Sequence, residues 1–554
     1  MAAFAARQRL RAFGRGARAL LPKRADYSML RRTWRGDVLA GVTVGVVALP
    51  LALAFGVSSG VGAEAGLITA IVAGVVAAVF GGSNVQVSGP TGAMVVVLAP
   101  IVVQFGVEVV ALVSLLAGVF VVIGGVLRLG RTVTYIPWPV IEGFTLGIAI
   151  IIAAQQVPAA LGVAAKVDPH AVAAAFAAFG QLEWPTAGWA IGVTLLVVAI
   201  MVVLPKLHRL LPASLIAIVV VTVLVNLLDA PVAVIGALPS SLPAPGLPAL
   251  GSIDPLVLVG PAAAVAALAA IESLLSARVA ASLAPTGGVD ADRELVGQGL
   301  ASIASGFFGG MPATGAIART AVNVRSGGRS RLSAIVHSLV LLLVVYAASG
   351  LVSGIPLAAL AGVLIVTAAR MVAPATVRAI VRSTRSDAAI FIITAIVTIS
   401  FDLIVAVLIG IAAAALMALR DLARSSSVTR EPLPGPAADG DERIALVRLE
   451  GALFFGAAER VLDEIAAIDD VSVVVIRLSQ LRSLDATGAR VISDIIDALE
   501  RRGVTAIVKG VQPQHLGLIE RVGVTHHLRH PRHLISSLDA AVEHARSHVL
   551  RERL

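Results

Sequence analysis

Two short strings in this 554-residue chain could together bind an anion. One runs from Ser88 to Ala93 (SGPTGA) and the other from Met311 to Ala316 (MPATGA). In each, a proline comes shortly before Thr-Gly-Ala and an apolar run, which predicts an extended stretch leading into a short helix. A helix start offers unpaired backbone N–H groups and about half a positive charge, which suits an anion. The candidate substrate-binding residues in these strings are Ser88, Thr91, Gly92, Ala93, Thr314, Gly315 and Ala316.

Side chains and glycines in the strings support this interpretation. Gly92 and Gly315 would let the backbone approach a ligand closely, while Ser88, Thr91 and Thr314 add hydroxyl groups. The alternative, for the first string taken alone, is a capped helix that begins at a proline and binds nothing.

Two charged residues lie in apolar surroundings. Glu272 follows an uncharged run and is the candidate ion-coupling residue, with Ser276 one turn later, because a carboxylate in hydrocarbon is costly. A structural ion pair of Glu272 with Arg278 or Arg319 is the alternative. Arg319, five residues after Thr314, would strengthen an anion site, and a lipid-headgroup contact is its alternative role.

Composition places the chain in a membrane. Apolar residues make up 58% and charged residues only 14%, and the mean hydropathy is +0.94. The net charge of +9 (43 − 34) comes from basic residues between apolar runs, so no nucleic-acid partner is expected. No Walker loop is present, so ion gradients must supply the energy.

The sequence does not predict an enzyme, and it suggests no cofactor other than a coupling ion, H⁺ or Na⁺. Cysteine is absent, and seven of the ten histidines lie beyond residue 510. Four of these, His526, His527, His530 and His533, indicate a solvated basic stretch, because no cysteine or spaced carboxylate completes a metal-binding set. No catalytic and no metal-binding residue is therefore predicted.

Fourteen segments are expected to cross the membrane. Twelve are apolar runs near the length of about 20 residues that a spanning helix needs, and the two strings add one broken segment each. The twelve runs are 38–57, 64–81, 107–127, 140–160, 187–205, 212–228, 255–283, 294–309, 332–353, 356–373, 388–401 and 403–419, and the broken segments are 85–104 and 311–324.

Loop charges predict the orientation. Lysine and arginine fall in the even-numbered loops, whereas the odd-numbered loops carry Lys166 alone, which makes both termini cytoplasmic. Residues 1–36 are Arg-rich and are expected to form a cytoplasmic tail, with a transit peptide as the alternative. The expected location is the cell membrane, with membrane lipid around a transport domain of residues 37–424.

The two strings predict an internal repeat. Thr314 follows Thr91 by 223 residues (314 − 91), and each string occupies the third segment of a group of seven. Because seven is odd, the second copy would be inverted, and the two half-helices would face each other at mid-membrane.

A second domain follows the membrane spans. Residues 425–440 read as a linker and 441–554 as a cytoplasmic α/β domain. Its expected strands are 444–449, 471–478 and 505–508, and its expected helices are 456–467, 486–501 and 533–548.

Over nearly its whole length the chain resembles the sulfate permease (SulP) family of anion transporters. The likeness rests on Leu49 to Phe55 (LPLALAF), on the string from Ser88, and on the run from Gly310 to Asn323 (GMPATGAIARTAVN). The C-terminal part resembles a STAS domain through Leu484 to Gly488 (LDATG). The resemblance implies a seven-plus-seven inverted repeat in which a core domain moves against a gate domain, an elevator-type movement, usually in a homodimer.

The resemblance also implies roles for single residues. Phe55 corresponds to an aromatic residue that lines the family's site, and Arg319 to an arginine beside it. Glu272 corresponds to an acid that in bicarbonate carriers is an aspartate helping to bind sodium. Glutamate here makes proton coupling at least as well supported as sodium coupling. Leu51 stands where many relatives have glutamine, so the substrate is not read from this position.

The predicted function is secondary active transport of a small anion, with sulfate first and proton coupling favoured. The alternatives are sodium- or proton-coupled bicarbonate or C4-dicarboxylate transport, an uncoupled anion channel regulated by the STAS domain, and a regulatory membrane sensor that signals through that domain. A purine or uracil carrier of the same general fold is a further alternative, but such carriers lack this C-terminal domain. Asp485 and Thr487 form a candidate regulatory site, since a phosphate on Thr487 would be stabilised by the dipole at a helix start. A regulatory partner that binds the STAS domain is also expected. Plain N-capping is the alternative for both residues.

Overall fold

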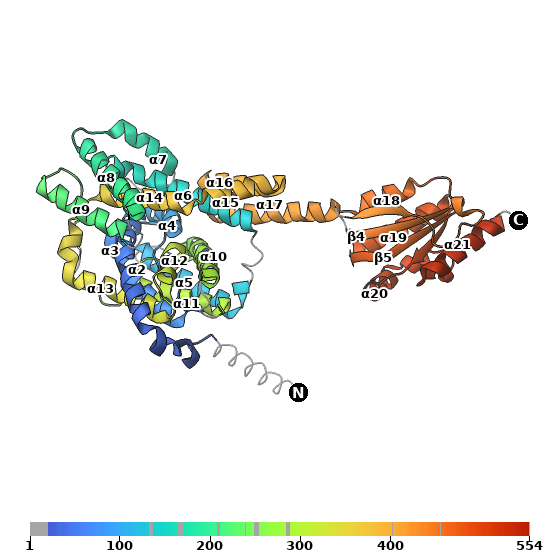
Figure 1. Ribbon diagram of the computed structural model, residues 1–554, viewed down its shortest axis with the longest axis horizontal. Helices are drawn as coiled ribbons and strands as arrows, with labels where there is room; N and C mark the ends of the chain where they lie inside the picture. The colour runs from blue at the N-terminus through green and yellow to red at the C-terminus, as the bar shows by residue number, and fades with distance from the viewer. Residues whose placement is uncertain are drawn as a thin grey trace. The chain divides into compact units, whose positions relative to one another are not determined.

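The computed structural model describes residues 20–131, 137–163, 171–207, 211–238, 240–248, 254–283, 288–400, 403–424, 426–454 and 456–552. The chain forms two compact units, Met1–Ile411 and Ala412–Leu554, called the N-terminal and C-terminal units (Figure 1). The predicted linker, 425–440, lies inside the C-terminal unit. Residues 1–19 of the predicted N-terminal tail lie outside the described residues. Lys166, the basic residue predicted in an external loop, also lies outside them.

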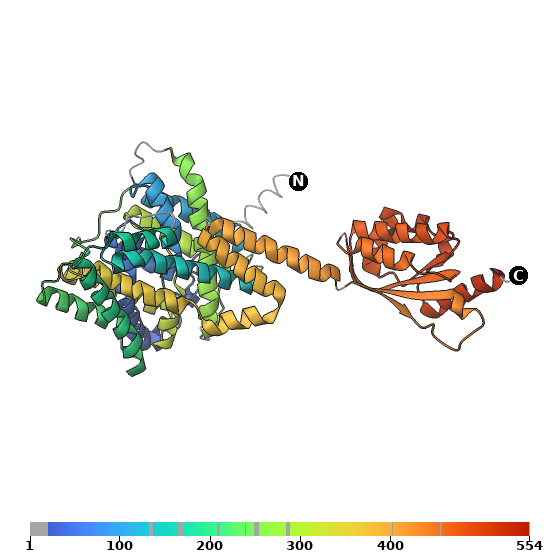
Figure 2. The same cartoon turned by 90° about the horizontal axis from the view of Figure 1, so that it is seen from above.

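Each of the fourteen predicted membrane segments contains a helix. Figure 2 shows the helical N-terminal unit in a second view. These helices are α2 (Leu30–Ser58), α3 (Ala63–Phe80), α4 (Gly92–Phe105), α5 (Val109–Val126), α6 (Trp138–Ala160), α8 (Thr186–Leu207), α9 (Ala213–Leu227), α10 (Val259–Leu283), α11 (Ala291–Phe307), α12 (Ile317–Arg325), α13 (Arg331–Ser353), α14 (Leu357–Met371), α16 (Arg385–Ser400) and α17 (Leu403–Arg424). Among the described residues, eight helical segments are long and apolar enough to cross a membrane by length and composition alone. The chain is therefore a multi-span helical membrane protein.

Two further helices were not predicted. Helix α7 (Ala171–Ala178) is alanine-rich but has only 8 residues, too few to span a bilayer. Helix α15 (Pro374–Ser383) starts with proline in its first turn and carries Arg378 and Arg382. Neither segment has the long apolar run that predicts a membrane span, and the sequence predicts a loop at both.

Close helix packing in the N-terminal unit depends on small residues. A Cβ atom on Gly118 of α5 would lie 2.6 Å from the carbonyl oxygen of Gly299 on α11, and one on Gly299 would lie 2.5 Å from that of Gly118. Glycine at both positions lets the two backbones touch, as is common between helices in membranes.

The two broken segments have the predicted form. Strands β1 (Ser88–Gly89) and β2 (Thr314–Gly315) each precede a short helix, α4 and α12. The strands pair antiparallel, with Ser88 opposite Gly315 and Gly89 opposite Thr314. Antiparallel pairing sets the two copies in opposite directions, as an inverted repeat requires.

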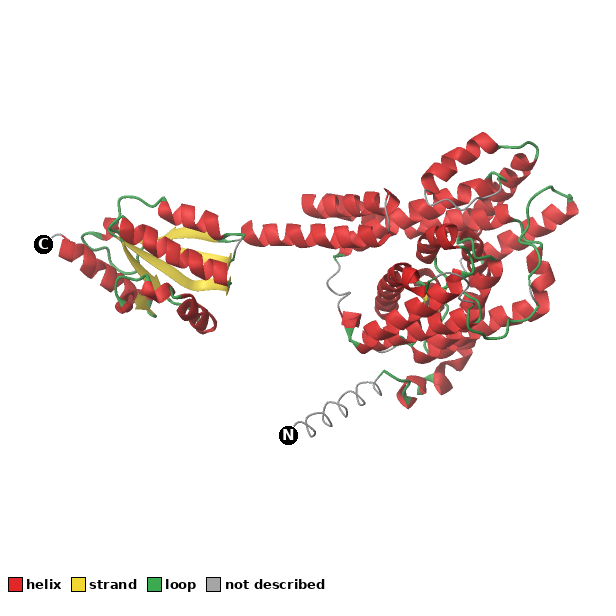
Figure 3. Ribbon diagram, turned by 180° about the vertical axis from the view of Figure 1, so that it is seen from behind, coloured by secondary structure: helices red, strands yellow, loops and turns green. Residues whose placement is uncertain are grey.

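The C-terminal unit is a five-stranded sheet with helices (Figure 3). The strand order is β3-β4-β5-β6-β7, with β3 antiparallel to β4 and the other neighbours parallel. The strands are β3 (Ser427–Glu431), β4 (Ile444–Leu453), β5 (Val473–Leu484), β6 (Thr505–Lys509) and β7 (Leu534–Ile535), and the helices are α18 (Ala458–Ala466), α19 (Ala486–Arg501), α20 (Pro513–Val522) and α21 (Leu538–Glu552).

Alternate residues of β4 enter two different cores. Val447 packs in a cluster with residues of α18, α19 and α20, whereas its neighbour Leu446 packs in a cluster with α21. Successive side chains of a strand point to opposite faces, so both faces of the sheet are covered. This explains why the central strands read as continuous apolar runs.

Three elements of this unit were missed by the sequence analysis. Strand β3 (SVTRE) lies in the segment expected to be linker, because an edge strand with exposed polar residues gives no apolar alternation. Strand β7 has only two residues. Helix α20 begins at Pro513 and was not predicted.

Candidate functional site

Pairing of β1 with β2 brings the two strings together and starts α4 and α12 from one place. Thr91 and Ala316 are the residues at the N-caps of these helices, and neither side chain caps its helix. The first-turn N–H groups of both helices therefore have no side-chain cap. Uncapped helix starts attract an anion through N–H donors and the helix dipole.

The Thr91 hydroxyl is directed at another helix and does not cap α4. It donates a hydrogen bond of 2.8 Å to Oε2 of Glu272 on α10. The next residue, Ser273, accepts a hydrogen bond of 3.0 Å from the backbone N–H of Gly315. Helix α10 thus contacts both strings, and the half-buried Glu272 lies at the start of α4.

Arg319 brings a positive charge to the same place. It is 2% exposed, and its Nη2 donates a hydrogen bond to the backbone oxygen of Pro90. Its Nη1 is buried and has no hydrogen-bond partner among the described residues. Arg319 and Glu272 interact electrostatically. A buried guanidinium with an unused N–H donor can bind an anion directly.

Phe55 lies against the start of α4. A Cβ atom on Gly92 would be 3.4 Å from Cε1 of Phe55, and it would also contact the end of Ile152 on α6. Phe55 is 6% exposed. Ala93 and Ala316 are buried and add apolar surface.

Three predicted hydroxyls are used within the protein. The Ser88 hydroxyl accepts a hydrogen bond of 2.6 Å from Nε2 of Gln298. Ser276 Oγ lies 3.3 Å from the hydroxyl oxygen of Thr320 and forms a hydrogen bond with it. Among the described residues, no hydrogen bond joins Ser276 to Glu272. The Thr314 hydroxyl donates to the backbone oxygen of Gly315 at 3.3 Å.

Several polar residues of the site were not predicted. Glu294 on α11 is 1% exposed, and its carboxylate accepts hydrogen bonds from the backbone N–H groups of Gly82 and Ser83 at 2.7 and 2.9 Å. It thereby anchors the segment that leads into β1. Both side-chain polar atoms of Gln86 are buried without a partner among the described residues. Polar residues within apolar spans were the available signal.

A cavity of about 580 Å³ lies beside the site. Its lining includes Ala54, next to Phe55, and Ser58 and Gln156, which are joined by a hydrogen bond of 3.1 Å. Gly162 and Val232, from loops that were predicted to be external, also line it. The cavity therefore lies between loops that were predicted to be external and Ala54, the residue before Phe55.

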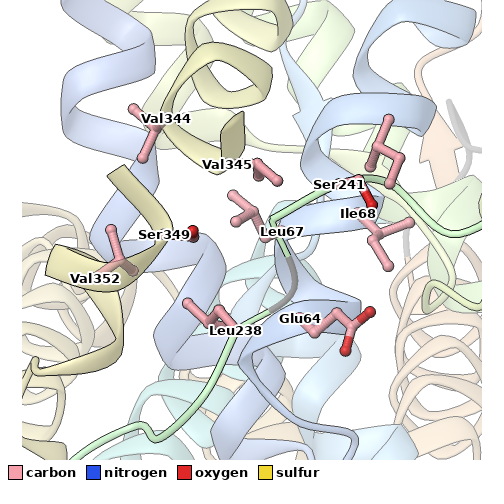
Figure 4. Close-up of a pocket in the computed structure, with 10 residues that line it drawn as sticks. Glu64, Leu67, Ile68, Leu238, Ser241, Val344, Val345, Ser349 and Val352 are labelled. Carbon is pink, nitrogen blue, oxygen red and sulfur yellow. The ribbon is translucent and has the colours of Figure 1, made fainter. Parts of the chain in front are cut away.

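A different pocket, drawn in Figure 4, is mostly apolar. Val344, Val345 and Val352 of α13 face Leu67 and Ile68 of α3, with Glu64 at one side. No predicted substrate-binding residue lines it. Its chemistry does not suit an anion, so it is not the candidate site.

In the C-terminal unit, Asp485 caps helix α19. Its side chain accepts a hydrogen bond of 2.7 Å from the backbone N–H of Gly488. Thr487, two residues after the cap, is exposed. The capping interpretation therefore holds for Asp485, while Thr487 has an accessible hydroxyl at a helix start.

We expect Asp485→Ala to destabilise the C-terminal unit by about 1 kcal/mol, because it removes an N-cap hydrogen bond. Thermal unfolding of the purified protein measures this. The matched control is Asp439→Ala, since Asp439 is exposed, does not cap a helix and does not have the left-handed backbone that would strain an alanine. Equal unfolding midpoints for Asp485→Ala and wild type would contradict the prediction.

Comparisons with known proteins cover nearly the whole chain. The model described as "Sulfate permease family" matches residues 34–394, and the model described as "STAS domain" matches residues 435–541. The putative sulfate transporter YvdB of Bacillus subtilis is 35% identical over 505 residues, 88% of this chain and 94% of that protein. The bicarbonate transporter BicA of Synechocystis is 31% identical over 516 residues, 89% of this chain and 91% of that protein.

Solved structures show the same architecture. The transmembrane domain of a cyanobacterial bicarbonate transporter, BicA, matches with a TM-score of 0.61 and 33% identity, covering 69% of this chain and 98% of that one. The structure of SLC26A9 matches with a TM-score of 0.79, covering 95% of this chain and 92% of that one. At 17% identity, this second likeness is one of fold alone.

Proposed function

The chain belongs to the sulfate permease family, and from that premise we propose that it is a secondary active transporter carrying a small anion across the cell membrane. Sulfate is the first substrate to test, and bicarbonate the second, because relatives carry both names. C4-dicarboxylates remain the third, since helix starts respond to charge more than to shape.

The observation that carries the proposal is the pair of uncapped helix starts. Helices α4 and α12 begin at the β1–β2 pair without a side-chain cap, and Arg319 adds a buried cation beside them. Two positive helix ends and one guanidinium together would form a binding site for an anion.

The proposed mechanism is an elevator-type movement with alternating access. The β1–β2 pair and the bonds of α10 to both strings join these elements, so they would move together as a core. The cavity lined by α2, α6, α8 and α14 would then admit anion from one side in this conformation. Proton coupling through Glu272 is part of the proposal.

Uptake into proteoliposomes tests this function. Purified protein is reconstituted, labelled sulfate is supplied with an inward proton gradient, and unlabelled sulfate, bicarbonate and succinate compete in turn. Accumulation above equilibrium that collapses with a protonophore supports coupled transport. Flux that equilibrates at the same rate with or without proton and sodium gradients would instead indicate a channel.

The C-terminal unit is proposed to regulate transport, with both termini in the cytoplasm and a homodimer as the working assembly. The exposed hydroxyl of Thr487 at the start of α19 supports a phosphorylation site, because phosphate is stabilised by a helix N-terminus.

We expect Thr487→Glu to change the initial uptake rate at least about twofold, because it places a negative charge at this helix start. Ser536→Glu, at another exposed position of the same unit, is the control.

A chain truncated after Leu422 tests the whole domain. Unchanged folding, dimerisation and transport after truncation would leave the domain without the proposed role.

A further inference from the structure

Three histidines of the C-terminal unit converge, although the sequence was read there as a solvated basic stretch. His533 lies in the turn before β7, and His544 and His548 lie one turn apart on α21. One ligand nitrogen from each ring lies within 4.8 Å of the other two. His533 is only 3% exposed, and His544 and His548 are half-buried. Of the four histidines that were expected to be solvated, His533 is therefore buried, and the expectation is wrong for it.

Two of these nitrogens are buried and have no hydrogen-bond partner among the described residues: Nδ1 of His533 and Nε2 of His544. Buried polar atoms are nearly always satisfied, so two unsatisfied nitrogens in one cluster of three histidines need an explanation. The His533 ring also hydrogen-bonds the backbone of Ala506. Since Nδ1 has no partner, Nε2 makes that bond, which leaves the Nδ1 lone pair free for another ligand.

Burial favours the neutral form of all three rings. Burial and the neighbouring His548, His544 and His530 lower the pKa of His533 to about 4. Burial also lowers the pKa of His544, with Arg551 and Arg532 as further causes. The pKa of His548 is lowered in the same way by burial, His544, Arg551 and Arg529, against a smaller opposite effect of Glu552. Neutral imidazole is the form that binds metal.

We propose that His533, His544 and His548 form a binding site for a divalent transition metal, with Zn²⁺ as the ion that fits three imidazole ligands. Zinc commonly binds three protein ligands and one water in a tetrahedral arrangement, and two histidines one helical turn apart are a familiar source of such ligands. The bound ion would join the turn before β7 to α21, which otherwise packs through Ala541, Ala545 and Val549.

Little rearrangement is needed. With zinc–nitrogen distances of about 2.1 Å, tetrahedral ligand atoms lie roughly 3.4 Å apart. The three nitrogens already lie within 4.8 Å of one another, so ring rotations that shorten these separations by up to about 1.4 Å would complete the site. The fourth position is left for water.

Zinc binding by the full-length protein in detergent tests the proposal. The protein carries an affinity tag without histidine, is stripped with a chelator, and is titrated with Zn²⁺ in competition with a chromophoric chelator. We expect one Zn²⁺ per chain, with nitrogen ligands at about 2.0–2.1 Å in X-ray absorption spectra. Zinc should also raise the unfolding temperature of the wild type.

The variants are placed on α21, because His533 is too buried to be changed safely. His544→Gln and His548→Gln should each weaken zinc affinity at least about tenfold and remove the thermal stabilisation. His526→Gln is the matched control, since His526 is exposed and lies outside the cluster. Two results would overturn the proposal. One is a double variant, His544→Gln/His548→Gln, that binds zinc with the stoichiometry and affinity of the wild type. The other is a wild type that binds no zinc.

Discussion

Replacing Glu272 with glutamine should abolish proton-driven accumulation of the anion while anion binding and exchange remain measurable. Glu272 contacts the start of α4 through a hydrogen bond of 2.8 Å from the Thr91 hydroxyl. Glutamine keeps the size of the side chain and an oxygen that accepts this hydrogen bond, but it cannot release a proton.

The expected split between coupling and binding follows from where the charge acts. A protonated Glu272 would leave the positive charge of Arg319 for the anion, whereas an ionised Glu272 would compete with the anion for that charge. Proton binding and anion binding would therefore favour each other, which is the linkage that a symporter needs. A fixed neutral side chain keeps the binding state but loses its dependence on the proton gradient.

The measurement is uptake into proteoliposomes with an imposed proton gradient, alongside counterflow exchange without one. Glu108→Gln, which changes an exposed glutamate at the start of α5, is the matched control and should accumulate anion as wild type does. Undiminished proton-driven accumulation by Glu272→Gln would show that Glu272 is not the coupling residue. If the wild type accumulates anion with a sodium gradient alone, Glu272 and Ser276 are instead expected to form a cation site.

Gly315→Val should reduce anion affinity and uptake by roughly tenfold to a hundredfold. A Cβ atom on Gly315 would collide with the side-chain amide of Gln86 and lie 3.2 Å from Cβ of Ser276. Overpacking in a buried site costs roughly 1–3 kcal/mol. Because Gly315 is in β2, the displaced atoms would lie where α12 begins, and the cost should fall on the geometry of the two helix starts.

Affinity is measured by binding or by competition for uptake, and folding is checked by size-exclusion profile and unfolding temperature. Gly192→Val is the matched control, because a Cβ at Gly192 on α8 would meet nothing within 4 Å. Gly92→Val provides a second test at the other helix start, where the added atoms meet the flexible end of Ile152 and the Phe55 ring. Wild-type affinity in folded Gly315→Val and Gly92→Val would exclude the helix-start site.

Much of the fold could be predicted because its signals are local. In a bilayer every backbone polar group must be satisfied within the chain, so a long apolar run has to be helical. This placed a helix in each of the fourteen segments, from α2 to α17. The broken segments were equally readable, because proline and glycine restrict or free the backbone at their own positions. The cap at Asp485 is a local pattern of the same kind.

The partners of the polar side chains could not be predicted, because they depend on residues far apart in the chain. Ser88 and Thr91 are similar hydroxyl residues in one string, yet Ser88 bonds Gln298 and Thr91 bonds Glu272. Which way each hydroxyl points depends on how α10 and α11 pack beside β1. The substrate roles of the remaining string residues stay predictions.

The sequence by itself determined where the helices of the predicted membrane segments lie, which two segments are broken, and the α/β character of the C-terminal unit, because hydrophobic length and backbone restriction are local properties. Only the tertiary structure decided that the strings pair as β1 and β2, that Arg319 lies against Pro90, and that three histidines converge. His533 is 11 residues before His544 (544 − 533), and a turn and β7 must fold back before their rings can meet. Such contacts depend on the direction of side chains in packed elements, which no pattern along the chain contains.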